Sequence, residues 1–454
     1  MPTIANPLRV PVALASSNGR YEGRWPAGDR PAPPVVLTGS ASALATVIVA
    51  SLTTGGGGSL PYPTPNTSTD KFVSASAAGS GDGSFASPWT LTQAIAGLTA
   101  GQKCWLRAGT YTPPTTWSSN SGSSGSPIEM LAYPSEFVRL DLQAASSANG
   151  SNIEKSYWNF WGIDLKAGAR GLTGFTSANH HVNFYYCSGT KNALYNDNCG
   201  IVMFDQGAGN GTQIYLCDFS SAVTGGNNEA LIYISQLTDF DIAGNRLTGS
   251  QHPIYQKHDY GSSASPSAHA RKIRNNIIKD AEVSVWVNFV GTQVFDNLLI
   301  NSDLFNDING GPSSAQDFDM HHNTHYNGQI IWYSASTGSK FRDSILAGNC
   351  RIATPNGAPS TIGFEQHDYN QFQAGASRSP FYPFFSSQTF AQWKSANPTF
   401  DAHSNQADVT FSAGWSSSSV TPAHWAITAP SSALTGSSTG GLRGCDTTKL
   451  LTVD

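Results

Sequence analysis

Charged residues and long helical patterns are both scarce in this chain. Only 12% of its 454 residues are Asp, Glu, Lys or Arg, and residues 31–69 contain none. The formal net charge is −5 and no long run of Lys or Arg occurs, which argues against a nucleic-acid partner. Because the composition lacks the Glu and Lys of a helical protein, an all-α fold is also disfavoured.

Signals for export and for membrane insertion are weak. Met1 is not followed by a basic and then an apolar segment, so we expect no ordinary signal peptide. The candidate apolar stretch is residues 35–52, which small polar residues interrupt. A packed or β-rich stem is therefore favoured over a membrane span, and we expect no membrane partner.

The cysteines lack the spacing of a metal site. No Cys-x-x-Cys pair occurs among the six cysteines, which argues against zinc. Cys187 and Cys217 fall at nearly the same place in successive repeats. We expect them to be buried packing residues rather than a disulfide.

Glycine and aromatic residues, in contrast, are abundant. The chain has 45 glycines, and Phe, Trp and Tyr make up 11% of it. So many aromatic residues argue against disorder, and the glycines, with many Ser and Thr, indicate frequent turns. We therefore expect an all-β protein.

A weak repeat begins near Trp158. Short apolar runs each adjoin one small or polar residue, with a mean spacing of about 26 residues, which is typical of a solenoid with one coil per period. We expect these residues to adopt left-handed backbone at a tight bend and to stack on the next coil. They are Gly162, Ser188, Asp218, Asn245, Asn276, Asn297, Asn323 and Ser344.

One helix is expected before this repeat, over residues 90–98. Leu91, Ala94, Ile95 and Leu98 form one apolar face, and Thr90 or Thr92 would cap the helix. Such a helix can cover the open end of a stack of strands.

The motifs around this helix resemble those of a known superfamily. Gly81-Asp82-Gly83, Pro88-Trp89 and Arg107–Tyr111 resemble the entry motif of the right-handed parallel β-helix, or pectate-lyase-like, superfamily. Residues 368–370, 390–393 and 401–404 are similar to the closing segment of bacterial and phage members. The resemblance implies a right-handed parallel β-helix solenoid over residues 70–365, with an N-terminal capping helix. Residues 1–69 would form an attachment module and linker, and residues 366–454 a closing segment.

A second row of short runs indicates a binding surface. Alternation along a strand would point Ile232, Ile254, Val285 and Ile331 inward. The outward set would be Tyr233, Tyr255, Trp286 and Trp332, beside Asp205, Ser235, Lys257, Asn288 and Ser334. Outward aromatic rings can stack on sugars, so we expect a polysaccharide partner, with Asn288 also contacting it. In the alternative interpretation the aromatic residues are the buried set.

The densest group of catalytic side chains lies in residues 252–274. Lyases of this fold use Lys or Arg as the base, so Lys257 resembles a base and Arg271 a carboxylate clamp or acid. His258 and Asp259 lie in the same group. In the alternative interpretation Lys257 pairs with Asp205 or Asp259 on a solvated face.

Two other functions compete with elimination. A glycoside hydrolase would need paired carboxylates, for which the candidates are Asp205, Glu229, Asp259, Glu282, Asp303 and Asp307. A non-catalytic structural or adhesin β-helix is the other alternative.

No metal site is expected. Asp317, Asp319, His321, His322 and His325 cluster in sequence, but His322 and Asn323 are better explained as a coil bend. No cofactor is predicted, although calcium bound by Asp and Glu oxygens would suit a lyase.

The N-terminal composition makes the chain similar to a phage tailspike depolymerase. We expect a homotrimer that binds bacterial capsule or lipopolysaccharide and attaches to a virion baseplate or tail through residues 1–69. The expected location is the phage virion tail or the extracellular space.

Overall fold

The computed structural model describes most of the chain. The described residues are 14–15, 21–22, 60–143, 150–175, 180–193, 199–205, 210–221, 223, 229–235, 237, 239–257, 270–287, 290–306, 317–332, 338–354, 364–376, 379–383 and 387–453. The chain divides into two compact units, Met1–Ser40 and Ala41–Asp454. The described part of the first unit is one antiparallel pair, β1 (Leu14–Ala15) and β2 (Tyr21–Glu22).

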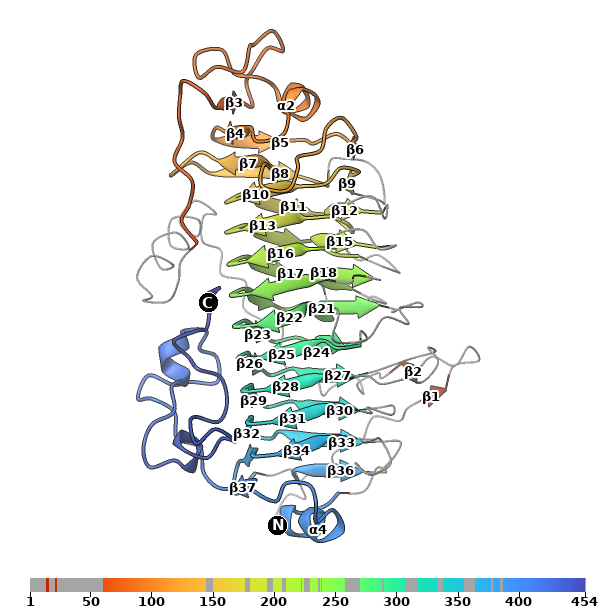
Figure 1. The fold of residues 1–454 in the computed structure, drawn as a ribbon, viewed down its shortest axis with the longest axis vertical. Helices are drawn as coiled ribbons and strands as arrows, with labels where there is room; N and C mark the ends of the chain where they lie inside the picture. The colour runs from red at the N-terminus through yellow and green to blue at the C-terminus, as the bar shows by residue number, and fades with distance from the viewer. Residues whose placement is uncertain are drawn as a thin grey trace, which may run out of the picture. The chain divides into compact units, whose positions relative to one another are not determined.

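The second unit is built on three long parallel sheets, which the chain visits in turn (Figure 1). Sheet 1 has twelve strands: β3 (Lys71–Val73), β4 (Lys103–Leu106), β7 (Ile128–Ala132), β10 (Trp158–Trp161), β13 (Val182–Tyr185), β16 (Thr212–Tyr215), β19 (Phe240–Ala243), β22 (Arg271–Arg274), β25 (Gln293–Phe295), β28 (Asp319–His321), β31 (Lys340–Arg342) and β34 (Gln366–Asp368).

Sheets 2 and 3 follow the same progression, one strand per coil. Sheet 2 has twelve strands: β5 (Gly109–Tyr111), β8 (Val138–Asp141), β11 (Asp164–Ala167), β14 (Ser188–Lys191), β17 (Asp218–Ser221), β20 (Arg246–Thr248), β23 (Ile277–Lys279), β26 (Leu298–Ile300), β29 (Thr324–Tyr326), β32 (Ile345–Ala347), β35 (Gln371–Phe372) and β37 (Asn405–Gln406). Sheet 3 has eleven: β6 (Thr116–Trp117), β9 (Ser151–Ile153), β12 (Leu172–Gly174), β15 (Val202–Phe204), β18 (Ala230–Ser235), β21 (His252–Lys257), β24 (Val283–Val287), β27 (Asp303–Asn306), β30 (Gln329–Trp332), β33 (Arg351–Thr354) and β36 (Phe381–Pro383). The predicted all-β parallel β-helix is confirmed.

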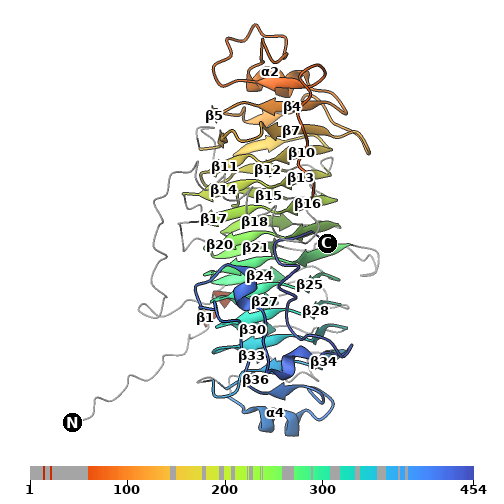
Figure 2. The same cartoon turned by 90° about the vertical axis from the view of Figure 1, so that its left-hand side faces the viewer.

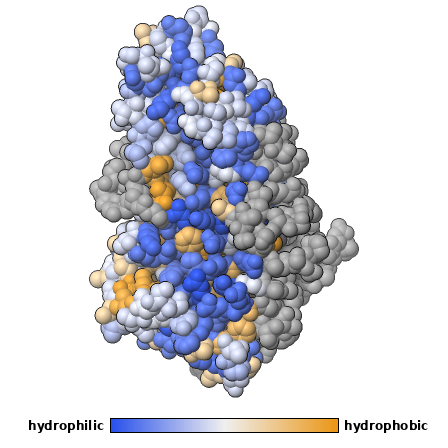
Figure 3. Space-filling view, viewed as in Figure 1, coloured by the Kyte–Doolittle hydropathy of each residue, from blue (hydrophilic) through white to orange (hydrophobic). Residues whose placement is uncertain are grey.

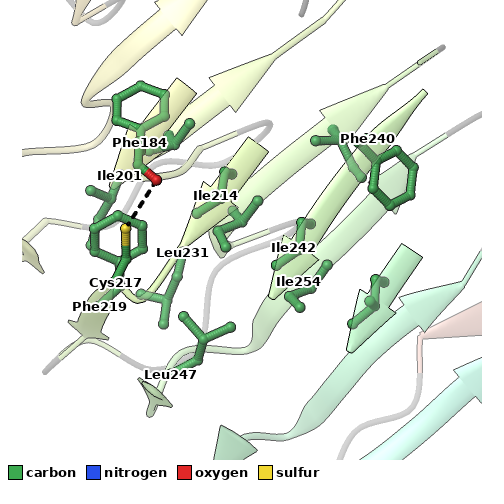
Figure 4. Close-up of a cluster of buried hydrophobic side chains, with 14 of the residues drawn as sticks. Phe184, Ile201, Ile214, Cys217, Phe219, Leu231, Phe240, Ile242, Leu247 and Ile254 are labelled. Carbon is green, nitrogen blue, oxygen red and sulfur yellow. Dashed lines mark hydrogen bonds between the residues drawn. The ribbon is translucent and has the colours of Figure 1, made fainter. Parts of the chain in front are cut away.

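The strands of successive coils stack one above another (Figure 2). Apolar side chains from the three sheets fill the interior of the coils (Figure 4). Phe184, Ile214 and Ile242 are at most 1% exposed. Cys217 points into the same core, with Sγ 3.6 Å from the Phe184 carbonyl oxygen. Cys187 is likewise buried and unbridged, so both cysteines are packing residues, as predicted.

A ladder of asparagine amides joins successive coils. The Nδ2 of Asn245 donates to the Oδ1 of Asn276 at 2.9 Å, and Asn276 donates in the same way to Asn297. Asn297 continues the ladder to Asn323 at 3.0 Å. The predicted stacking between coils is therefore confirmed for these four residues.

The left-handed backbone predicted for the ladder residues lies instead at the residue before each ladder position. Asn275, Asp296, His322 and Asp343 have φ between 53° and 58°. The predicted alignment was wrong at its start, because strand register places Ile163, Cys187 and Cys217 in the ladder column. Gly162 precedes that column, whereas Ser188 and Asp218 follow it.

Short helices lie at both ends of the stack of coils (Figure 1). The expected first helix is α2 (Leu91–Gly97), and Thr90 forms a capping box with Gln93. Its buried apolar residues join the interior core. At the other end lies α4 (Phe390–Ala396), whose Trp393 ring stacks on Phe381 at 4.1 Å.

Segments before and after the coils pack on the outside of the β-helix. Residues 60–69 were expected to be linker, yet the Tyr62 hydroxyl donates to the Ala132 carbonyl oxygen at 2.8 Å. Residues 407–453 run back along sheet 2, where Cys445 and Leu450 pack on Leu298. The 3-10 turns Pro422–Trp425 and Ser432–Leu434 lie in this segment.

The surface shows no large apolar face in the view of Figure 3. Its described residues are mainly hydrophilic, with hydrophobic residues in small separate patches. Among the residues that the structure describes, no helix is long and apolar enough to cross a membrane. Residues 35–52, the candidate apolar stretch, lie outside the described residues.

Candidate functional site

The outward face of sheet 3 carries most of the predicted binding residues. Tyr233 pairs with Tyr255 across β18 and β21, and Tyr255 pairs with Trp286 across β21 and β24. Their neighbours Ile232, Ile254 and Val285 are fully buried in the interior core. The alternation predicted for these three strands is therefore present.

These outward aromatic residues form a closed cluster of their own rather than an open ladder. Tyr233 is 1% exposed and Tyr255 is 6% exposed. They pack with Met203 and Ala230, while Trp286 is partly buried at the edge of the cluster. We call Met203, Ala230, Tyr233, Tyr255 and Trp286 the outer cluster. It is held together by ring contacts with centroids 5.7 and 5.4 Å apart.

The prediction that Trp332 faces outward is wrong. Register pairs Trp286 with Phe305 and Phe305 with Ile331, so Ile331 occupies the outward column. Trp332 is fully buried in the interior core and its ring lies 4.6 Å from that of Phe364. The three consecutive apolar residues of β30 give no period-two signal, so the sequence could not fix which one points inward.

A polar row follows the outer cluster at the ends of β15, β18 and β21. Ser235 pairs directly with Lys257. The backbone N–H of Asp205 donates to the Gly174 carbonyl oxygen at 2.9 Å and continues the same column. Lys257 is 8% exposed and Asp205 is partly buried. The structure therefore brings Asp205, Ser235 and Lys257 together, two residues beyond the aromatic column.

Five of the residues that the sequence suggested for the site lie outside the described residues. They are His258, Asp259, Asn288, Asp307 and Ser334.

Arg271 does not belong to this outward face. It begins β22 of sheet 1, pairs with Phe240 and is 1% exposed. Its guanidinium donates to the carbonyl oxygens of Leu237 at 3.0 Å and Val290 at 2.5 Å. The prediction that Arg271 acts as a carboxylate clamp or acid is wrong, because its buried guanidinium instead satisfies backbone carbonyls in the interior.

Glu229 is also buried rather than solvent-facing. Its Oε1 lies 3.2 Å from Lys191 Nζ, and both side chains have no exposed surface. The Ser221 hydroxyl donates to the same oxygen at 3.0 Å. A carboxylate held in this way belongs to a structural ion pair, so Glu229 is not available to act on a bound sugar.

The remaining acidic candidates do not form a pair across the polar row. Glu282 precedes β24, at the opposite end of the strands from Asp205. Asp303 Oδ1 accepts a hydrogen bond from the Gln329 backbone N–H at 2.8 Å. Among the described residues, Asp205 is thus the carboxylate nearest to Lys257 in register.

His252 is a site residue to which the sequence pattern assigned no role. It pairs with Ala230 on β18, is 3% exposed and stacks on Tyr255 with ring centroids 4.9 Å apart. The Trp286 ring contacts its edge, also at 4.9 Å. Burial lowers the pKa of His252 to about 3, so the imidazole is neutral. The sequence shows that His252 lies close to Tyr255, but it does not show that the His252 side chain points outward.

The described residues contain no group of three or more His, Cys, Asp or Glu that could hold a metal ion. His322 has φ 53° at a coil bend, as predicted, and Asp319 pairs with Arg342 at 3.2 Å. Calcium takes six to eight oxygen ligands, and the polar row supplies only Asp205 and Ser235 from the described residues. We therefore derive no step through calcium.

Comparison with known proteins supports the type of fold. A family model described as "Pel9A-like, right handed beta helix region" matches residues 71–230. Residues 71–230 are therefore similar to a Pel9A-like right-handed β-helix region, and the three parallel sheets continue the same parallel β-helix fold along the later coils.

Two curated relatives are similar over part of the chain. Pectate lyase L of Dickeya chrysanthemi is 30% identical over 166 residues, covering 33% of this chain and 37% of that protein. Pectate lyase PEL9 of Emericella nidulans is 28% identical over 130 residues, covering 25% of this chain and 32% of that protein. The matched region thus spans about a third of each relative.

Two solved structures align with a larger share of the chain, at low identity and low TM-score. Pectate lyase Pel9A covers 82% of this chain and 92% of its own length, with a TM-score of 0.43 and 15% identity. A rhamnogalacturonan lyase covers 74% and 87%, with a TM-score of 0.38 and 14% identity.

Proposed function

We propose that this protein cleaves an acidic polysaccharide by β-elimination, with Lys257 as the base. The observation that carries the proposal is the position of Lys257. This amine lies in the polar row with Ser235 and Asp205, beside the outer cluster on the outward face of sheet 3. The two pectate lyases similar to residues of this chain support an acidic substrate.

The reaction needs one proton acceptor and no covalent intermediate. The amine of Lys257 removes the proton from C5 of a uronate, whose carboxylate stabilises the charge that develops there. The electron pair forms the C4–C5 double bond, and the bond from C4 to the glycosidic oxygen breaks. The leaving oxygen takes a proton from solvent, so the products are a new chain end and an unsaturated uronate.

The location of Lys257 suits a base. Its side chain is 8% exposed, so it is largely shielded from water while remaining on the outward face. Lysines in such surroundings serve as general bases in other enzymes. A glycosidase is less well supported, because Glu229 is closed in an ion pair and Glu282 lies at the other strand end.

The test is a lyase assay on polygalacturonate, alginate and bacterial capsule polysaccharide. A rise in ultraviolet absorbance is expected with at least one of them, and Lys257→Ala should abolish it. Lys272→Ala is the matched control, because Lys272 lies on the outward face of sheet 1. Reducing ends without ultraviolet absorbance would instead indicate hydrolysis, and full activity of Lys257→Ala would overturn the assignment.

The finer biological setting is part of the same proposal. We infer a tailspike-type depolymerase, homotrimeric, acting on capsule or lipopolysaccharide and attached to a virion through residues 1–69. The support is the uncharged stretch at residues 31–69, with its Gly55–Ser59 run. Light scattering of the full chain tests the trimer, and a monomer mass would contradict it.

A further inference from the structure

A neutral imidazole lies buried in the outer cluster, and the elimination step makes no use of it. His252 is 3% exposed, and none of the described residues offers its Nδ1 a hydrogen-bond partner. A buried polar atom without a partner costs about 1–3 kcal/mol. Native proteins rarely keep such an atom unless something else binds it.

The ring is held in place from several sides. The His252 backbone N–H donates to the Glu229 carbonyl oxygen at 2.9 Å. The carboxylate of Glu229 is itself fixed by Lys191 in the buried ion pair. Tyr255 stacks on the imidazole at an interplanar angle of 19°, and Trp286 packs against its edge at 78°. The direction of Nδ1 is therefore set before any ligand binds.

The charge state of this ring selects the kind of group it can bind. Because burial lowers the pKa of His252 to about 3, the imidazole stays neutral at ordinary pH. A neutral imidazole offers one N–H and one lone pair. A sugar hydroxyl both donates and accepts, so it can bind either nitrogen of the neutral ring, whereas a carboxylate can only accept from the nitrogen that carries the proton.

The strand also sets the distance between His252 and the base. Both lie on β21, five residues apart, which is about 16 Å along an extended strand. This distance exceeds the width of one sugar ring. A sugar unit bound at His252 is therefore not adjacent to the unit that reacts at Lys257.

We propose that His252 is a specificity-determining residue of the polysaccharide site, hydrogen-bonding through Nδ1 to a hydroxyl of a sugar unit that packs on Trp286. Trp286 is the partly buried aromatic ring of the outer cluster and contacts the edge of the His252 ring, so a sugar that packs on Trp286 would lie next to His252. The proposal rests on the proposed function and adds to it the recognition of a neutral hydroxyl on a unit that is not adjacent to the cleaved one.

The test compares His252→Phe with the wild type on polygalacturonate and on its trimer. Phenylalanine keeps the ring contacts but removes Nδ1. On the polymer, KM should rise about tenfold, the loss of about 1.4 kcal/mol of binding, while kcat stays within about twofold. On the trimer, which binds at Lys257 without reaching His252, both constants should be unchanged.

His325→Phe is the matched control. His325 is 2% exposed on sheet 2, and burial lowers its pKa to about 3 as well. It should leave both KM values unchanged while lowering the melting temperature about as much as His252→Phe does. Calorimetric titration of polygalacturonate into Lys257→Ala and Lys257→Ala/His252→Phe measures the same binding loss without turnover.

Three results would overturn the proposal for His252. Unchanged KM on the polymer, equal losses on polymer and trimer, or equal polymer affinity in the two calorimetry variants would each do so. If Lys257→Ala is inactive while His252→Phe behaves as wild type, only the role of His252 fails. If Lys257→Ala keeps full activity, the elimination assignment fails, and the calorimetry still decides the binding role of His252.

Discussion

His367 Nδ1 lies 2.8 Å from Asp401 Oδ2, and neither side chain has exposed surface. Trp393 of α4 donates its indole N–H to the same carboxylate oxygen at 2.7 Å. The pair therefore joins the last strand of sheet 1, the helix that follows the coils and the turn after it. Removing one partner of a buried pair leaves the other without compensation.

Asp401→Asn should lower the free energy of unfolding by about 3–5 kcal/mol. The matched control is Glu365→Gln, because Glu365 is 57% exposed and pairs with Lys340 at 3.3 Å. An exposed pair contributes about 0–1 kcal/mol. Chemical denaturation of both variants measures the difference, and equal losses would show that the buried pair has no special role.

Asp368 links the same two segments through a pair that depends on pH. Burial alone would raise the pKa of Asp368, but hydrogen bonds from the His403 ring and from the backbone N–H groups of Tyr369 and His403 outweigh it and hold the pKa below its usual value. A carboxyl with a lowered folded-state pKa adds stability above its unfolded-state pKa. That contribution disappears as the pH falls through the folded-state pKa.

Asp368→Asn should therefore be less stable than the wild type at pH 7, and the difference should shrink below about pH 4. Urea denaturation of both proteins at a series of pH values measures it. A difference that stays constant down to the most acidic pH would contradict the assigned direction of the pKa shift.

The asparagine ladder should be costly to interrupt at its centre. The Asn297 side chain donates to Asn323 and to the Ile273 carbonyl oxygen, and its Oδ1 accepts from Asn276. Asn297→Ala leaves these buried groups unpaired, so we expect a loss of about 2–4 kcal/mol.

Asn183→Ala is the control for the ladder. Asn183 is partly exposed on the outward face of sheet 1, where it donates to Asn159 at 2.9 Å and accepts from the Gln213 backbone N–H at 2.8 Å, and water can replace the lost bonds there. We expect its substitution to cost about 1 kcal/mol or less. If both alanine variants lose the same stability in thermal unfolding, burial of the ladder does not matter.

The fold could be predicted because its signals repeat with every coil. Two such signals are the asparagine ladder, at Asn245, Asn276, Asn297 and Asn323, and the apolar stripe of residues 91–98. Each depends on the type of residue at a regular spacing, which the sequence shows directly. The register at Ser188 and Asp218 was less certain, because the ladder position there is held by cysteine rather than asparagine. A left-handed residue next to the ladder has no fixed identity, since Tyr186, Leu216 and His322 all occupy that position.

The candidate site was harder to predict because side-chain direction depends on contacts between coils. Lys257 and Arg271 are both basic residues near a strand end, yet one lies on an outward face and the other bonds interior carbonyls. Glu229 looked like a solvated acid because its partner, Lys191, is a full coil earlier. Because the two partners of such a pair lie on different coils, a sequence pattern within one coil does not reveal them.

The inward position of Trp332 gives a direct test of the register of sheet 3. Its indole packs on Phe364 in the interior, whereas Ile331 lies partly buried on the outward face. Trp332→Ala should cost about 3–5 kcal/mol through the cavity it leaves, and Ile331→Ala about 1 kcal/mol. Because Trp332 does not reach the outward face, the polysaccharide KM of folded Trp332→Ala should match the wild type. A raised KM with nearly unchanged stability would instead place Trp332 outside the core and contradict the pairing of Phe305 with Ile331.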